Sequence, residues 1–422
     1  MPGPLEGIRI VEFTQIIAAP FGGMLLSDMG AEVIKIEPIG GEPWRLHSEF
    51  IPKESKTYMG LNRGKKSLPL DLKNPKSVEI IHKLIEKTDV VIINARPDVP
   101  EKLGIDYETF KSINPQIIYC DNTAFGRKGP DRLKPGYDVV VQAMSGLMAA
   151  DNKVADGTPQ QVTATAVADF STAIAIAWAV SSALFSRERT GKGQMIETSL
   201  LATALAIQPA FFEVTDYGHA DREEYINNIN ILRQAQMPYE LLLEERQNFI
   251  GRGSDFKTYY TTYQTKDQAI AIGCLSNSLR EKAAKVIGLE DPRFQPNYDP
   301  TNPSNMEKFD SNFLLAKKTI ASKPVTFWLE AFDKAGVPAG AVKFVEELFE
   351  DPQVLANDNV VTLHHEKAGE VKMFGPILKM SETPLKAQFA SPVLGQHTNE
   401  LLSFLGYSDS QIEEFKQENI TE

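Results

Sequence analysis

The chain reads Ile8-Arg-Ile-Val-Glu-Phe13 near its start and Ala31-Glu-Val-Ile-Lys-Ile-Glu37 shortly after, with Pro20–Met29 between them. The two outer segments are rich in β-branched residues, which favour strands. The middle segment begins with proline and is followed by Gly30, which is typical of a helix. This order predicts a β-α-β unit, in which the two strands run parallel.

The same alternation continues through the first half of the chain. Apolar runs at Val90–Asn94, Gln116–Cys120 and Gln194–Thr198 predict further strands, and Lys76–Thr88 and Tyr107–Ile113 predict helices. Strands that alternate with helices favour a parallel sheet covered on both faces. We therefore expect an α/β fold whose large domain is doubly wound.

The character of the sequence changes after this region. Residues 215–248 are polar, charged and mostly helical in pattern, and Tyr259–Tyr263 and Ala269–Gly273 then have the pattern of strands. We expect a large domain in residues 1–204, a linker in 205–255 and a small α+β domain in 256–324. A length of 422 residues is also more typical of two domains than of one.

Composition excludes some classes of partner. The chain is 42% hydrophobic and 24% charged, as is usual for a globular protein, and its formal net charge is −12. Nucleic acids and anionic membranes need a basic face, so neither is expected as the main partner. Cys120 and Cys274 each lie in an apolar run, which predicts buried free thiols in a reducing compartment. The first residues lack the pattern of a signal peptide, and we expect a cytoplasmic protein.

Several common catalytic patterns are missing from the sequence. The first turn after a strand, Thr14-Gln-Ile-Ile-Ala-Ala-Pro20, lacks the Gly-x-Gly-x-x-Gly pattern, which disfavours a nicotinamide or flavin cofactor. No phosphate-binding Walker loop or Gly-x-Ser-x-Gly elbow occurs. No spacing typical of a metal site occurs either, because the six histidines are scattered and His364-His365 lies in a polar stretch. We expect neither a metal nor a permanently bound cofactor.

One acidic residue stands at the start of a long apolar segment. Asp169 is followed by seventeen uncharged residues, Phe170–Ser186, which predict a helix packed inside the protein. The apolar run looks too short and too rich in Ser and Thr to span a bilayer. The positive end of the helix dipole would hold Asp169 ionised, which suits a nucleophile. Aspartate is equally a preferred helix cap, so both interpretations stay open.

Basic residues gather in the same half of the chain. Asn62-Arg-Gly-Lys-Lys-Ser67 is expected to be a turn with three positive charges, and Asn94-Ala-Arg-Pro97 follows directly on a predicted strand. Parallel sheets bind ligands at the carboxyl ends of their strands, and phosphates need charged donors. A merely solvated charged loop would show the same pattern.

Beyond these features, the chain resembles the class III coenzyme A transferases, the CaiB/BaiF family, in an ordered series of motifs over nearly its full length. The matching segments are Leu5–Thr14, Met29–Glu37, Asn62–Ser67, Leu70–Lys73, Asn94–Pro97, Asn114–Tyr119, Gly126–Pro130, Pro135–Asp138, Gln142–Gly146, Arg189–Gln194, Glu350–Val354 and Leu394–Thr398. The resemblance is weakest over residues 205–255.

The resemblance implies a fold and a mechanism. Residues 1–204 would form a large CoA-binding domain, to which residues 325–422 would return after a further linker, and two chains would form an interlocked homodimer. Asp169 would be the nucleophile that attacks an acyl-CoA thioester and gives a mixed anhydride and CoA thiolate. An aspartyl-CoA thioester would then pass CoA to an acceptor acid, which splits one difficult step into easier ones.

The resemblance also implies which residues contact the coenzyme. Lys73, Arg96 and Lys102 would meet phosphates. The remaining contacts would flank the adenine or the pantetheine arm: Ile16, Ala18, Leu70, Asn94, Ala95 and Tyr137.

Two departures from the family pattern bear on the substrate, and a third favours transfer over racemisation. Ile17 replaces a glutamine of some formate- and oxalate-using members, and Ile250-Gly-Arg-Gly-Ser254 has only two glycines where those members have a glycine-rich flap. A larger or more apolar acid is therefore expected. Family racemases carry histidine where this chain has Tyr137, between Gly136 and Asp138, and tyrosine is a poorer base near neutral pH.

CoA could move from one molecule to another or, within one molecule, between two carboxyls of a diacid. Two alternatives to CoA transfer remain open. The first is a 2-methylacyl-CoA racemase or epimerase. The second is a protein that binds CoA esters without catalysis.

Overall fold

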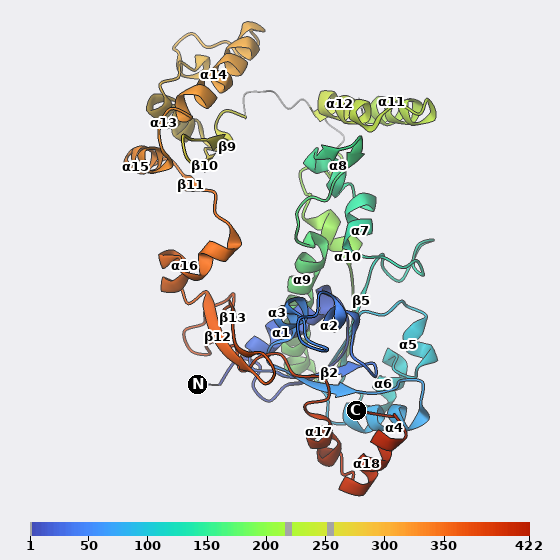
Figure 1. Ribbon diagram of the computed structural model, residues 1–422. Helices are drawn as coiled ribbons and strands as arrows, with labels where there is room; N and C mark the ends of the chain where they lie inside the picture. The colour runs from blue at the N-terminus through green and yellow to red at the C-terminus, as the bar shows by residue number, and fades with distance from the viewer. Residues whose placement is uncertain (1, 216–221, 251–256) are drawn as a thin grey trace. The chain divides into compact units, whose positions relative to one another are not determined.

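The computed structural model describes residues 2–215, 222–250 and 257–422. Their contacts divide the chain into a large unit, Met1–Asp216 with Gln353–Glu422, and a small unit, Tyr217–Pro352. Each unit has its own apolar core. Figure 1 labels the helices and strands of both.

The large unit is built on a six-stranded sheet with the order β3-β2-β1-β4-β5-β8 (Figure 1). Every neighbouring pair is parallel. From β1 the chain builds outward to β2 and β3, and then crosses to the other side of β1 for β4, β5 and β8. This confirms the predicted parallel, doubly wound sheet, whose switch point lies between β1 and β4. The strands are β1 (Arg9–Phe13), β2 (Glu32–Glu37), β3 (Lys65–Pro69), β4 (Val90–Ile93), β5 (Ile118–Thr123) and β8 (Gln194–Ser199).

Helices cover both faces of this sheet. Successive residues of β1 point to opposite faces, so that Ile10 joins the core under α1 and α9 while Val11 joins the core under α4, α6, α17 and α18. Burial on both faces explains why the strands are almost continuously apolar. The covering helices are α1 (Ala18–Asp28), α4 (Pro75–Ile85), α6 (Tyr107–Ile113), α9 (Val167–Thr190), α17 (Thr398–Phe404) and α18 (Asp409–Gln417).

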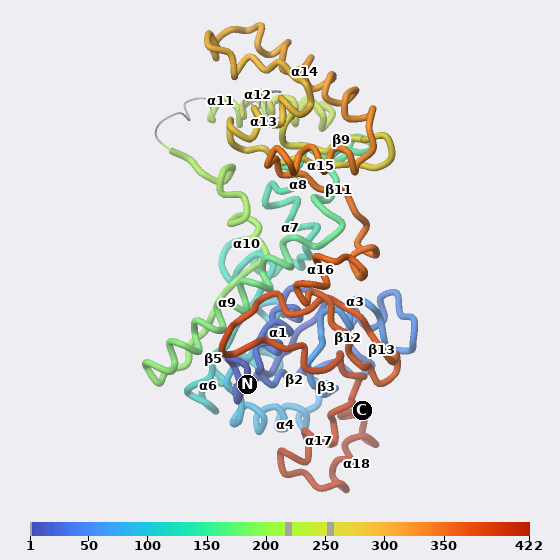
Figure 2. Tube along the Cα trace, turned by 90° about the vertical axis from the view of Figure 1, so that its left-hand side faces the viewer, coloured from blue at the N-terminus to red at the C-terminus, as the bar shows by residue number. Residues whose placement is uncertain are grey.

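Helix α9 is longer than the apolar run indicated. It has 24 residues, because it continues through the charged segment Arg187–Thr190 and ends at Gly191 in the left-handed conformation. By length and composition it is the one helix in the described ranges that could cross a bilayer, which corrects the expectation that it is too short. In the structure it is a core helix: Ile176, Val180 and Leu184 are buried, and Figure 2 shows α9 alongside α1.

Strand β3 was not expected, because Lys65 and Lys66 made its start look like a solvated turn. Lys65 is fully buried, and its Nζ lies 2.7 Å from Glu12 Oε1. Arg63 is also buried and forms an ion pair with Asp28. A buried cation is tolerated only when it is paired and hydrogen-bonded. These charges therefore hold the sheet together and are not available to phosphate, which corrects the earlier interpretation of this segment.

Shorter elements complete the large unit. An antiparallel hairpin of β12 and β13 and a two-stranded ribbon of β6 and β7 accompany the main sheet. These elements and the remaining helices are α2 (Pro43–Leu46), α3 (Lys56–Asn62), α5 (Val99–Lys102), α7 (Asp138–Met144), α8 (Leu147–Asp151), β6 (Val154–Ala155), β7 (Thr158–Pro159), α10 (Leu200–Ala206), α16 (Pro352–Ala356), β12 (Val360–His365) and β13 (Gly369–Phe374).

The small unit contains a three-stranded antiparallel sheet with the order β11-β10-β9. Its core includes Val325, Trp328 and Phe332 of α15, so this unit continues beyond the expected boundary at residue 324. The stretch expected as a linker contains two helices, α11 and α12, that pack on each other. The elements are α11 (Arg222–Gln234), α12 (Tyr239–Ile250), β9 (Tyr260–Gln264), β10 (Ala269–Gly273), α13 (Asn277–Ile287), η2 (Pro292–Phe294), α14 (Ser304–Ile320), α15 (Val325–Ala335), β11 (Ala339–Ala341) and η3 (Val345–Phe349).

Candidate active site

A cavity of about 620 Å³ lies at the carboxyl ends of β1, β2, β3 and β4. This is the edge at which doubly wound sheets bind ligands, next to the switch point. Four of the predicted coenzyme contacts line it: Leu70, Lys73, Asn94 and Ala95. Its walls are otherwise largely apolar, with Ile36, Ile93, Val99, Leu103 and Ile105 among them.

Asn94 links the ends of two neighbouring strands. Its Oδ1 accepts a hydrogen bond from the Gln15 backbone N–H at 3.0 Å, and its Nδ2 donates to the Gln15 carbonyl at 2.8 Å. Both bonds hold the turn that follows β1. The side chain therefore shapes the cavity by fixing the backbone, in addition to lining it.

Arg96 and Lys102 lie just outside this cavity, on the loop and short helix after β4. Both pair with Asp98: Lys102 Nζ is 2.6 Å from Oδ2, and Arg96 Nε is 3.4 Å from Oδ1. The hydrogen bond from Lys102 lowers the pKa of the Asp98 carboxyl. Both cations are exposed, so the structure brings them together at the surface beside the cavity but not into its lining.

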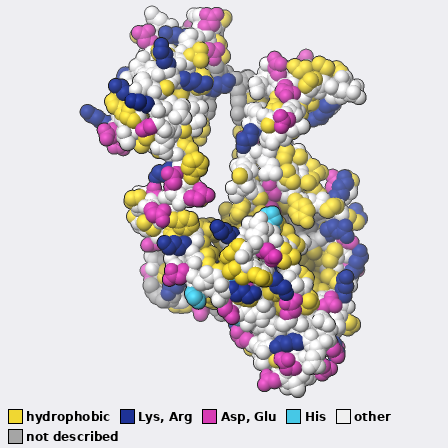
Figure 3. Space-filling view, in the orientation of Figure 1, with side chains coloured by type: hydrophobic (Ala, Val, Ile, Leu, Met, Phe, Trp, Pro, Cys, Tyr) yellow, Lys and Arg dark blue, Asp and Glu magenta, His cyan; other side chains and the backbone are white. Residues whose placement is uncertain are grey.

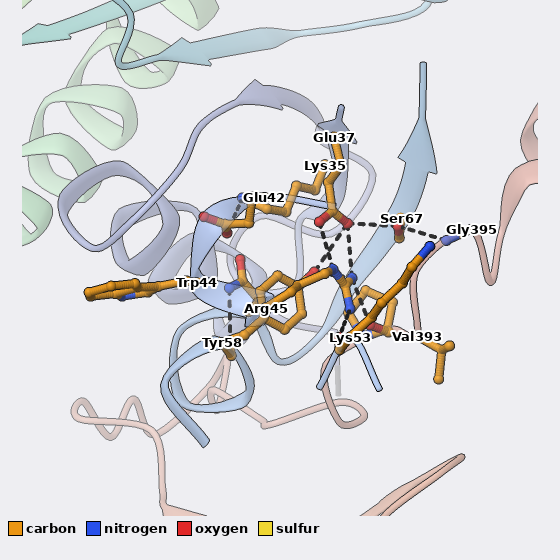
Figure 4. Close-up of polar contacts among 12 residues, drawn as sticks. Lys35, Glu37, Glu42, Trp44, Arg45, Lys53, Tyr58, Ser67, Val393 and Gly395 are labelled. Carbon is orange, nitrogen blue, oxygen red and sulfur yellow. Dashed lines mark hydrogen bonds and ion pairs between the residues drawn. The ribbon is translucent and has the colours of Figure 1, made fainter. Parts of the chain in front are cut away.

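The turn after β1 has an unusual backbone. Ile16 has φ +73°, in the left-handed region, where a β-branched residue is strained by about 1–3 kcal/mol. Its N–H donates to Glu42 Oε2 at 2.8 Å. The Glu42 Oε1 atom lies 3.1 Å from Lys35 Nζ, and Lys35 also donates to the Thr14 carbonyl at 2.8 Å. The buried ion pair of Lys35 and Glu42 thus holds the turn at Thr14 and at Ile16 (Figure 4).

The charges of this pair depend on each other. Burial by itself would lower the pKa of Lys35, but the carboxylates of Glu42 and Glu12 outweigh that effect, and the pKa is raised. Lys35 therefore remains a cation in the interior. Its charge is what allows Glu42 to stay in place as an acceptor.

A second buried network ties the C-terminal segment to the sheet. Arg45 makes two hydrogen bonds to Glu37, at 2.7 and 2.9 Å, and donates to the Pro392 carbonyl at 3.0 Å. Ser67 donates to Glu37 at 2.7 Å and accepts from the Gly395 N–H at 3.1 Å. Figure 4 shows Arg45 and Ser67 both bonded to Glu37, and Gly395 bonded to Ser67. The network fixes the position of Glu37, which lines the first cavity.

Asp169 lies in the first turn of α9 and is 7% exposed. The helix is not capped by Asp169, because the N-cap position is Ala166. Asp138, at the start of α7, occupies that end instead: its Oδ1 accepts from the N–H groups of Ala168 at 2.7 Å and Asp169 at 3.3 Å. Gln142 donates to the other oxygen of Asp138. The interpretation of Asp169 as an ordinary cap is thereby excluded.

The ionisation of Asp169 also differs from the expectation. Burial first, and the neighbouring carboxylate of Asp138 second, raise the pKa of Asp169 to about 7. The helix dipole was expected to keep it fully ionised. Asp138 already takes up the helix N–H groups, and its charge opposes a second one nearby. A carboxyl that titrates near neutrality is a feature of functional sites.

A second cavity, of about 590 Å³, is lined by residues that flank Asp169 in the chain, although Asp169 itself is not in its lining. Residues 164–166, just before α9, and Phe170, just after Asp169, form part of its wall. Ile17 lines this cavity and Gln15 lines the first one. The strained turn at Ile16 therefore separates the two cavities.

Most of the amino-acid sequence matches the model of one protein family. The model of "CoA-transferase family III" matches residues 5–398. The chain belongs to this family. The resemblance found in the motifs is thereby confirmed, and the protein is a class III CoA-transferase, an enzyme class that uses CoA thioesters as substrates.

Curated relatives are similar over most of their length. The chain is 32% identical to an acetyl-CoA:oxalate CoA-transferase of Acetobacter aceti, over 90% of each chain. It is 30% identical to a succinyl-CoA:glutarate CoA-transferase of Homo sapiens, over 97% of this chain and 88% of the relative. Among solved structures, a CAIB/BAIF family protein from Brucella suis is 27% identical and superposes with a TM-score of 0.73, covering 96% of this chain and 100% of the other.

Two further residues that were predicted to contact the coenzyme, Ala18 and Tyr137, line neither cavity. Ala18 is buried in a small core that also contains Ala168, next to the nucleophile candidate. Tyr137 precedes α7 and is 58% exposed, and it lines neither cavity. In the described parts of the chain, no group of His, Cys, Asp or Glu side chains is placed to hold a metal.

Sequence reasoning assigned no role to Asp138 or Glu42. Asp138 appeared only as the end of a motif, and Glu42 as one acid among many. Their functions depend on contacts with residues 26 to 31 positions away in the chain. No periodicity or local spacing signals such contacts.

Proposed function

We propose that this enzyme moves CoA from an acyl-CoA thioester to an organic acid through covalent intermediates on Asp169. The observation that carries the proposal is the buried carboxyl of Asp169 in the first turn of α9, whose pKa is raised to about 7 and whose neighbour in the chain, Phe170, lines the second cavity. The nucleotide end of CoA would occupy the first cavity, where Lys73 supplies a positive charge for phosphate. The thioester would cross the turn at Ile16 and reach Asp169.

The steps follow from carboxylate chemistry. An Asp169 oxygen attacks the thioester carbonyl, and the C–S bond breaks to give a mixed anhydride and CoA thiolate. The thiolate attacks the aspartyl carbonyl and releases the donor acid, which leaves an aspartyl-CoA thioester. The acceptor carboxylate then attacks this thioester and forms a second anhydride. The returning thiolate attacks the acceptor's acyl carbon and restores the Asp169 carboxylate. Donor and acceptor carboxyls on one diacid would undergo the same steps.

The direct test is to trap the intermediate. The protein is incubated with a panel of acyl-CoAs and free acids and then analysed by mass spectrometry, with peptide mapping. We expect a CoA or acyl adduct on the peptide that contains Asp169, and none in Asp169→Asn. Normal turnover by the asparagine variant would refute the proposal.

Racemisation is the second candidate, because a carboxyl that titrates near pH 7 can also remove a proton from carbon. It would exchange the C2 hydrogen of a 2-methylacyl-CoA for deuterium from solvent without any acceptor acid. Exchange that requires no acceptor and gives no covalent adduct would favour this candidate over transfer. Ligand binding without adduct or exchange would instead indicate a non-catalytic CoA-ester binding protein.

We also propose that the active form is an interlocked homodimer. One face of α9 exposes three large apolar side chains, Ile174, Trp178 and Phe185, which are 53%, 74% and 63% exposed. Apolar side chains gather over much of the displayed face of the large unit (Figure 3). Contiguous exposed apolar surface marks interaction sites. A sedimentation experiment at micromolar concentration that gives a monomer would contradict this.

The buried free thiols Cys120 and Cys274 support a reducing compartment, and we propose the cytoplasm. Burial raises the pKa of the Cys120 thiol to about 12, so it is not a competing nucleophile. Fractionation of the native host would test the location.

A further inference from the structure

Residues 419–422, which follow α18, return to the carboxyl end of β3 (Figure 1). Thr421 forms an antiparallel bridge with Leu70. The Ile420 carbonyl accepts a hydrogen bond from the Asp71 N–H at 3.0 Å, and both Ile420 and Thr421 are almost fully buried. The segment is therefore fixed to the turn after β3, which carries two of the predicted coenzyme contacts.

Glu422 joins this segment to a second loop. One of its carboxylate oxygens accepts a hydrogen bond from the Gly40 N–H, and the other lies 3.1 Å from Lys53 Nζ. Gly40 belongs to the loop between β2 and α2, and Pro38 and Ile39 of the same loop line the first cavity. Glu422 thus ties the loop after β2 to the turn after β3.

Asn419 is the member of this segment that lines the first cavity. Its backbone has φ +55°, in the left-handed region, which asparagine tolerates better than most residues. The residue is exposed, and in the described parts of the chain its side-chain amide makes no hydrogen bond. The amide therefore has both an N–H donor and a carbonyl acceptor for a ligand in the cavity.

The strand order places this amide at one end of the cavity. In the proposed function the thioester crosses the turn after β1 at Ile16, so the nucleotide lies at the far end. Strand β2 separates β3 from β1, and the turn after β3 brings Leu70, Leu72 and Lys73 into the lining beside Asn419. The two leucines give apolar surface for the faces of a purine ring, and the amide gives hydrogen bonds for its polar edge.

We propose that Asn419 binds the adenine of CoA and that Glu422 is a positioning residue, which holds the loop after β2 against this end of the cavity. The proposal rests on the proposed function, since it needs the nucleotide to occupy the first cavity. Adenine presents an amino donor next to a ring-nitrogen acceptor, and one asparagine amide matches both. The segment adds recognition of the base to the positive charge that Lys73 supplies for phosphate.

The test is the binding of CoA and of its two halves, adenosine 3′,5′-bisphosphate and 4′-phosphopantetheine, measured by calorimetric titration. Asn419→Gly removes the amide and keeps the left-handed backbone, which glycine adopts without strain. We expect Kd for CoA and for the nucleotide half to rise by roughly 5- to 30-fold, as the loss of two neutral hydrogen bonds implies, and Kd for the phosphopantetheine half to change by less than about 2-fold.

Gln236→Gly is the matched control. Gln236 also has a left-handed backbone and an exposed amide side chain, but it lies in the small unit and lines neither cavity. This change should leave all three dissociation constants as they are in the wild type.

The positioning role of Glu422 has its own pair of variants. Glu422→Ala removes the acceptor of the Gly40 N–H, whereas Glu422→Gln keeps an oxygen for it and loses only the charge beside the partly exposed Lys53. We expect KM for an acyl-CoA to rise by about 3- to 10-fold in Glu422→Ala, with kcat within about 2-fold of the wild type, and Glu422→Gln to stay close to the wild type in both.

A loss of affinity shared equally by the two halves of CoA, or no loss for CoA, would overturn the assignment of Asn419. Equal losses in Glu422→Ala and Glu422→Gln, or an effect on kcat alone, would overturn the positioning role. The failure of the proposed function is a separate outcome, because CoA would still bind through its adenine while no acyl-CoA gave an adduct on Asp169.

Discussion

Replacing Asp169 by asparagine should make the protein more stable at pH 8 while it abolishes turnover. In the folded protein the pKa of Asp169 is raised from 3.8 to about 7, first by burial and second by Asp138. The folded state therefore resists the ionised form. An asparagine of nearly the same shape is neutral at every pH and avoids that cost.

The magnitude follows from the linkage between pKa and stability. Below about pH 4 the carboxyl is neutral in both the folded and the unfolded chain, so it carries no penalty. As pH rises from 4 to 7 the unfolded chain ionises first, and the folded protein loses stability until its own carboxyl ionises. A difference of about three pKa units corresponds to roughly 4 kcal/mol, and because the protein can relax around the charge we take this as an upper limit. For a chain of this size the gain amounts to about 1–2 °C in Tm per kcal/mol.

The assay is calorimetric unfolding of the wild type and Asp169→Asn at pH 4.5 and pH 8. We expect the variant to gain several degrees in Tm over the wild type at pH 8 and little at pH 4.5. Asp98→Asn is the control, because the pKa of Asp98 is lowered by Lys102, and the change should bring no gain at pH 8. An advantage of Asp169→Asn that is absent at pH 8, or equal at the two pH values, would refute the assignment of the raised pKa.

Three further outcomes are expected. Asp138→Asn removes a neighbouring negative charge, so the pKa of Asp169 should fall and the acid limb of the kcat/KM profile should move to lower pH. Glu42→Ala removes one of the two carboxylates that pair with the buried Lys35, and because Glu12 remains it should lower the free energy of unfolding in urea by about 1.5–3 kcal/mol. In that background, Ile16→Gly removes the strain at φ +73° and should restore part of the lost stability. Trp178→Lys should dissociate the proposed dimer in sedimentation experiments while circular dichroism stays unchanged.

Each of these outcomes has a clear opposite. If the pH profile does not move in Asp138→Asn, the charge of Asp138 does not raise the pKa of Asp169. The turn would not depend on its acceptor if Glu42→Ala kept full stability, or if Ile16→Gly recovered nothing. An intact dimer of Trp178→Lys would place the interface away from α9.

The fold could be predicted where local sequence and burial agree. The segments around β1, α1 and β2 are apolar, and Pro20 and Gly30 mark the ends of the predicted helix. The structure has a strand, a helix and a parallel strand there. Strand β3 escaped prediction because Lys65 is polar and yet fully buried. The carboxylate of Glu12, which is 53 positions away, and the carbonyl of Pro20, which is 45 positions away, make that burial tolerable. Local patterns hold no information about such a partner.

Sequence alone identified the family, the doubly wound sheet and the acid at the head of the apolar helix. These depend on short-range order: runs of apolar residues, turn residues and motifs. The tertiary structure decided the pKa of that acid and formed the two cavities. Asp138 meets α9, Glu42 meets the turn at Ile16, and the two cavities form only after the strands are assembled. Charge–charge and hydrogen-bond energies act over a few ångströms in space, whatever the separation along the chain, so a sequence cannot display them.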